Sequence, residues 1–112
     1  WKRHIGNTAA APLIYREKII LNSDMGVIFC LDRNNGNLIW FFELKNKAFG
    51  MKIVSDKIVL GCAQGYLLVL DIHSGKIFDC FKISNENIKE ISEHNKRLAV
   101  GLENGKNYLI EA

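Results

Sequence analysis

The chain repeats itself with a period of 39 to 40 residues, and this period limits the folds open to it. Each copy opens with a short aliphatic run that leads to a turn glycine and then to an acidic residue. The landmarks are 18–21, Gly26, Asp32 and Gly36 in the first copy, 57–60, Gly65, Asp71 and Gly75 in the second, and 97–100, Gly105 and Glu111 in the third. Three copies in one register indicate three structural units of one kind.

The residues inside each copy are those of β-strands. The runs 19–21, 58–60 and 98–100 are rich in branched aliphatic residues, and each is followed by a glycine that allows a hairpin turn. The next runs, 27–31 and 66–70, are apolar at odd and even positions alike. Both faces of these strands must therefore be covered, which predicts sheets packed between neighbouring sheets.

Two further strands complete each predicted sheet. The turns 32–36 and 71–75 each begin with an aspartate that can accept backbone N–H groups and end with a glycine, and a strand follows each turn, over 38–42 and 76–81. A weaker strand precedes each aliphatic run. These weaker strands are expected at 13–15, 52–54 and 88–92.

The third of the weaker strands has a helical alternative. Ile88 and Ile91 have helical spacing, and Ser84 is a suitable N-cap for a short helix over 84–93. The alignment of the repeats favours the strand.

Four short antiparallel strands every 39 to 40 residues match the period of β-propeller blades, which is about 40 to 50 residues. The sequence thus predicts an all-β chain of about three four-stranded blades, with approximate repeats 1–39, 40–78 and 79–112 in a single propeller segment. Three blades do not close a ring, which takes about four to eight. The expected partners are other blades of a longer parent chain or, less favoured, further copies of the same chain.

No pattern of catalytic, cofactor or metal-binding residues stands out, so the sequence predicts a protein that is not an enzyme. Asp32 and Asp71 recur at equivalent positions, as turn-forming residues do, whereas the two carboxylates of an active site break repeat symmetry. His4, His73 and His94 share no metal-ligand spacing. The segment 61–65 lacks the lysine and helix of a phosphate loop and is expected to form a hairpin turn.

Charge, hydropathy and cysteine content exclude several further classes. The net charge of +3 is spread along the chain, which gives no argument for nucleic acid binding. No apolar stretch approaches the roughly 20 residues that a membrane-spanning helix needs. The cysteines, Cys30, Cys62 and Cys80, form no CxxC motif and are odd in number, so we expect buried thiols that act as small hydrophobic residues.

The stretch 30–40, Cys-Leu-Asp-Arg-Asn-Asn-Gly-Asn-Leu-Ile-Trp, resembles the tryptophan-docking repeat of the quinoprotein, or pyrroloquinoline-quinone-like, β-propellers. Asp32, Gly36 and Trp40 match that pattern, and Trp1 lies 39 residues before Trp40. The second copy has Asp79 in place of the tryptophan. WD-repeat propellers are a near alternative, but their Gly-His and Trp-Asp dipeptides are missing.

The resemblance implies that Trp1 and Trp40 each pack flat between two blades as structural anchors. At the next seam, where Asp79 replaces the tryptophan, Phe78 or Phe81 is available to substitute. The implied function is a non-catalytic scaffold for protein–protein interaction, as in the outer-membrane assembly lipoproteins. The alternative is a fragment of a quinone-dependent dehydrogenase whose active-site residues lie outside this chain.

Overall fold

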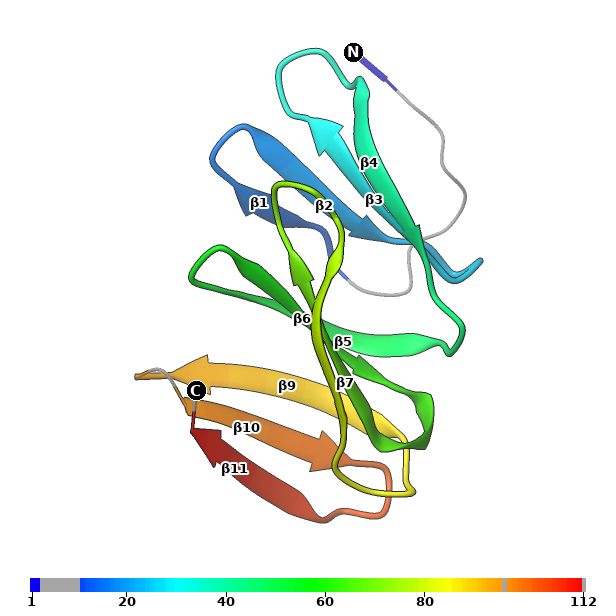
Figure 1. The fold of residues 1–112 in the computed structure, drawn as a ribbon, viewed down its shortest axis with the longest axis vertical. Coiled ribbons are helices and arrows are strands. Elements are labelled where there is room, and N and C mark those ends of the chain that lie inside the picture. Colours follow the sequence, from blue (N-terminus) through cyan, green and yellow to red (C-terminus); the bar gives the residue numbers. More distant parts are fainter. Residues whose placement is uncertain (3–10, 96, 112) are drawn as a thin grey trace.

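The computed structural model, which describes residues 1–2, 11–95 and 97–111, consists of three antiparallel β-sheets. The sheets follow one another along the long axis in chain order (Figure 1). The first two have four strands each, as predicted. The third has three strands within the described residues. The all-β prediction is confirmed.

Every sheet is built from strands that are consecutive in the chain. The first contains β1 (Leu13–Tyr15), β2 (Lys18–Asn22), β3 (Val27–Asp32) and β4 (Leu38–Glu43). The second contains β5 (Ala48–Val54), β6 (Lys57–Cys62), β7 (Tyr66–Asp71) and β8 (Ile77–Lys82). The third contains β9 (Ile88–His94), β10 (Arg97–Leu102) and β11 (Asn107–Glu111). A short 3-10 turn, η1 (Ala63–Gly65), joins β6 to β7.

The hairpins that open the three sheets turn in the same way. Arg16, Ser55 and Asn95 stand at equivalent positions and have φ values of 52°, 56° and 49°. The helical alternative for 84–93 is wrong, because Ile88–His94 pairs with β10 as a strand. The turn expected over 61–65 is shorter than predicted, since β6 continues through Cys62 and η1 makes the reversal.

Two apolar clusters hold the sheets together. Between the first and second sheets, Ile20 and Ile28 are buried with Ile58 and Leu60. Between the second and third sheets, the buried residues are Val59, Leu67, Ile88, Ile91, Leu98, Val100 and Leu102. The middle sheet is therefore covered on both faces, which explains why β7 is apolar without alternation.

The cysteines divide into two buried thiols and one exposed thiol. Burial raises the pKa of the Cys30 thiol to about 11 and that of Cys62 to about 12. Cys80 is exposed, so the expectation that all three would be buried is wrong for this residue. It lies on β8, the outermost strand of the second sheet, where all six residues are exposed.

This difference predicts selective modification of Cys80. At pH 8, iodoacetamide should alkylate one thiol in the folded protein and all three in 8 M urea, because Cys30 and Cys62 are both inaccessible and protonated when folded. Mass spectrometry of the alkylated chain gives the count. Cys80→Ser should leave the folded chain unmodified, and rapid alkylation of that variant would contradict the burial of the other two.

Candidate functional site

The most specific contact in the molecule joins Trp40 of the first sheet to a turn of the second. Trp40 is paired with Cys30 across β3 and β4, on the face that packs against the second sheet, and it is 8% exposed. Its indole Nε1–H donates a hydrogen bond of 2.9 Å to the Ile72 carbonyl. Its ring lies so close to Gly75 that a Cβ atom there would overlap ring atoms Cδ2 and Cε3. Only glycine fits beneath the indole.

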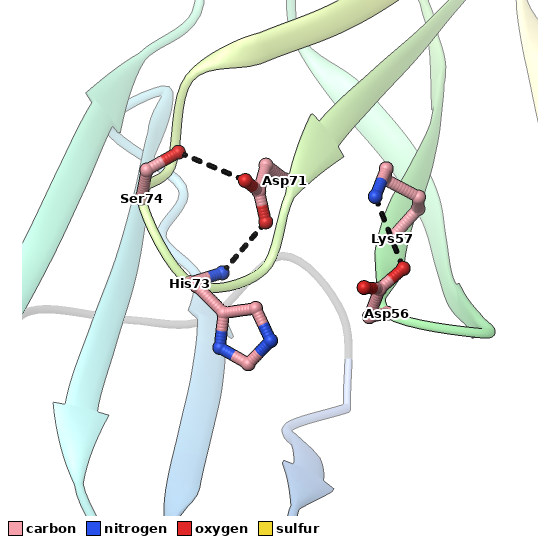
Figure 2. A network of polar contacts seen from close by, with 5 residues as sticks. All are labelled: Asp56, Lys57, Asp71, His73 and Ser74. Atoms are coloured by element: carbon pink, nitrogen blue, oxygen red, sulfur yellow. Dashed lines mark hydrogen bonds and ion pairs between the residues drawn. The ribbon is translucent and has the colours of Figure 1, made fainter.

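The receiving turn between β7 and β8 is shaped by Asp71 (Figure 2). Asp71 Oδ1 accepts the His73 backbone N–H at 3.0 Å, and Oδ2 accepts the Ser74 hydroxyl at 3.3 Å. The Gly75 N–H donates to the Asp71 carbonyl at 2.8 Å, with φ at Gly75 of 72°. These bonds fix the turn and thereby the position of the Ile72 carbonyl.

A second group of contacts ties this turn to the hairpin between β5 and β6. The Ile72 N–H donates to the Asp56 carbonyl at 3.1 Å. Lys57 Nζ lies 3.0 Å from Asp56 Oδ1, and this hydrogen bond, with the lysine charge, lowers the pKa of Asp56 (Figure 2). The Trp40 contact is thus made to a turn that is braced within its own sheet.

Trp1 makes the same contact one repeat earlier. Its Nε1–H donates to the Arg33 carbonyl at 2.8 Å, and its ring lies over Gly36, where φ is 75°. Asp32 Oδ1 accepts the Asn34 N–H at 2.8 Å and so shapes the receiving turn. We call each of these contacts, an indole on a carbonyl and over a glycine, a tryptophan dock. In both docks the indole and the carbonyl belong to residues 32 positions apart. Trp1 differs in being 58% exposed.

The dock is missing at the position of Asp79. Asp79 is exposed on β8, and Phe78 and Phe81 are 64% and 44% exposed. The described residues include no turn of the third sheet equivalent to 71–75, so the expectation that one of these phenylalanines substitutes for the tryptophan stays a prediction. Phe78 is instead positioned with Lys57 Nζ 4.6 Å from its ring centre.

The remaining repeat glycines lie in hairpin turns. Gly26, Gly65 and Gly105 connect β2 to β3, β6 to β7 and β10 to β11, with φ values of 81°, 78° and 87°. No heavy atom lies within 4 Å of a Cβ atom built on Gly105.

The residues weighed for metal or acid–base chemistry lie apart. In the described ranges no three His, Cys, Asp or Glu side chains are grouped to hold a metal ion. His73 is exposed in the Asp71 turn, and His94 is the last residue of β9. His4 lies outside the described residues. No helix in the described part of the chain has the length and apolar character to span a membrane.

Sequence reasoning missed a mostly apolar pocket of about 410 Å³ at the seam of the first two sheets. Its lining comes from the end of β4 and the loop after it and from β6, η1, β7 and β8, and includes Leu68 and Cys80. The first repeat has Phe29 and Phe41 at the equivalent positions. The smaller side chains in the second repeat leave this space, and the two exchanges are the sequence signal that would have indicated it.

The three sheets are β-propeller blades, and comparisons with solved structures show this fold. No protein-family model matches the sequence, and no curated protein matches it significantly. The computationally designed Ika4 protein aligns with a TM-score of 0.78 and 13% identity over 90% of this chain and 64% of its own. The designed Ika8 protein aligns with a TM-score of 0.72 and 12% identity over 90% of this chain and 32% of its own.

A natural propeller shows the same likeness. BamB from Moraxella catarrhalis aligns with a TM-score of 0.71 and 18% identity over 85% of this chain and 30% of its own. The chain thus spans less than two thirds of Ika4 and about a third of Ika8 and of BamB.

The buried dock predicts unequal effects of removing the two indoles. Trp40→Ala should lower the free energy of unfolding by about 3 to 5 kcal/mol, because it empties a buried site and leaves the Ile72 carbonyl without its donor. Trp1→Ala, at an exposed site, should cost about 1 kcal/mol. Urea unfolding followed by circular dichroism measures both, and equal losses would contradict the assignment of Trp40 as the anchor.

The close approach at Gly75 predicts a second contrast. Gly75→Ala should destabilise by at least about 2 kcal/mol, since it adds backbone strain at positive φ and displaces the Trp40 ring. Gly105→Ala is the matched control, with the same strain but no overlap, and should cost about 1 kcal/mol. Trp40 fluorescence, read in a Trp1→Phe background, should shift to longer wavelength only in the Gly75 variant.

Proposed function

We propose that this chain is a non-catalytic β-propeller segment that works joined to further blades as a scaffold for protein–protein interaction, of the outer-membrane assembly type. The observation that carries the proposal is the repetition of the tryptophan dock. The turn of the first sheet receives Trp1 through the same carbonyl and glycine positions that receive Trp40 in the second. The first sheet is thus built to be joined to a preceding blade, and the fold likeness to BamB supports the proposed class.

The surface offered to a protein partner in this proposal is the outermost strand β8. All six of its residues are exposed, and three of them, Ile77, Phe78 and Phe81, are large and apolar. Ile77 and Phe78 are 57% and 64% exposed, at the rim of the stack. Exposed aromatic residues that are held on a rigid strand are typical anchors of protein interfaces.

A photocrosslinking residue at position 78 tests the proposal in the host cell, with one at Asn104, an exposed polar residue in the turn between β10 and β11, as the control. We expect position 78 to capture a defined protein, which purified chain then binds saturably in calorimetry. Phe78→Glu should weaken that binding at least tenfold without changing the circular dichroism of the chain. Absence of saturable binding, or quinone binding with substrate oxidation, would overturn the proposal.

A further inference from the structure

The outer faces at the two ends of the stack have opposite chemistry. Residues directly opposite in an antiparallel pair lie on the same face of the sheet, so the strand register assigns each face. On the first sheet, the face turned away from the second sheet carries the rows Leu21–Phe29–Phe41 and Ile19–Leu31–Leu38. Every member of these rows is apolar, and the one polar residue that the register of the described strands adds to this face is Glu43, opposite Val27. Phe41 and Leu38, on the outer strand, are 55% and 44% exposed.

The opposite face of the first sheet packs against the second sheet. Ile20, Ile28, Cys30 and Trp40 belong to the buried cluster between the first and second sheets. The face that carries Phe29 and Phe41 contributes nothing to that cluster. Its residues are apolar, like those that meet between two blades, but no sheet among the described elements packs on them.

Trp1 indicates what belongs on this face. Trp40 is part of the outer strand of a sheet whose apolar face packs on the next sheet, and it reaches that sheet at Ile72 and Gly75. Trp1 occupies the equivalent place relative to Arg33 and Gly36. If another blade packed on the first sheet in the way that the first sheet packs on the second, the outer strand of that blade would include Trp1.

The outer face of the third sheet is polar. Its register gives the rows Ser92–Ala99–Leu109, Glu90–Gly101–Asn107 and His94–Arg97–Glu111. Leu109 is the one large apolar residue among these nine. Arg97 Nη2 lies 3.4 Å from Glu111 Oε1 in an exposed ion pair.

The first sheet has apolar residues in the row that is equivalent to Ser92–Ala99–Leu109 of the third sheet. Leu13, Ile20 and Cys30 stand there in register, where the third sheet has Ser92, Ala99 and Leu109. A sheet laid on the third face would remove Glu90 and Asn107 from water without supplying partners, which is unfavourable. Terminal units of stacked repeats carry such polar outer faces.

We infer that the segment docks in one direction: the outer face of the first sheet receives another propeller sheet with an apolar face, and the outer face of the third sheet stays in contact with water. This inference rests on the proposed function in that the segment works with further blades. It adds which end of the stack takes the neighbour and what chemistry the neighbour has.

A variant of the same chain provides the probe. Ser92→Leu/Ala99→Ile/Asn107→Ile gives the third sheet the residues that the first sheet carries at the equivalent positions 13, 20 and 28. In sedimentation equilibrium, this variant should bind wild-type chain head to tail at least tenfold more tightly than wild type binds itself. Phe41→Lys in the wild-type partner should abolish the gain, and Leu109→Lys there should not. A folded triple variant that gains no affinity would overturn the inference.

If the triple variant does not fold, two single variants test whether the first sheet carries the apolar docking face. Both Phe41 and Leu109 are exposed strand residues, 55% and 65%, so lysine is tolerated at either site. Anilinonaphthalene sulfonate fluorescence with wild-type chain should fall at least twofold with Phe41→Lys and stay unchanged with Leu109→Lys. Equal or reversed losses would show that the first face is not the apolar docking surface. Failure of crosslinking at position 78, by contrast, concerns only the proposed partner.

Discussion

Two directional contacts fix the relation of the first two sheets: the Trp40 indole donates to the Ile72 carbonyl, and the Asn22 side-chain amide donates to the Ala48 carbonyl at 3.1 Å. The apolar cluster between them supplies most of the attraction, but it is non-directional and would tolerate sliding of one sheet over the other. The indole prevents such sliding, because it must meet one carbonyl and lie over one glycine. The seam between the second and third sheets, which has Asp79 at that position, combines apolar packing with a hydrogen bond from the Gln64 backbone N–H to Asn87 Oδ1 at 2.8 Å.

Most of the strand pattern could be predicted from the sequence, because three copies in one register average out local ambiguity. Ile88–His94 is the clearest case, since its own spacing is helical and only its alignment with 13–15 and 52–54 indicates a strand. That Cys80, Phe78 and Phe81 are exposed and not buried could not be predicted from the sequence. Their exposure depends on what stands opposite β8, which is a matter of how the sheets are arranged and not of the local sequence.

The assignment of residues to faces was also beyond the sequence. The ladder between β3 and β4 shifts at Cys30 and Leu31, so that Leu38 pairs with Leu31 while Trp40 pairs with Cys30. Simple alternation would place Leu38 and Trp40 on one face, and the bulge separates them. The second sheet repeats the shift at Val69 and Leu70. The family resemblance indicates Trp40 as a docking residue, but the apolar outer face is visible only once the register is known.

In the described part of the chain, the apolar clusters join each sheet only to the sheets before and after it in the sequence. In such a row each sheet is stabilised mainly by its neighbours, so unfolding should begin at a terminal sheet and proceed one sheet at a time. The middle sheet, protected on both sides, would be the last to exchange its amide hydrogens with solvent. Gene duplication of one such unit would lengthen the row without redesigning what is already there.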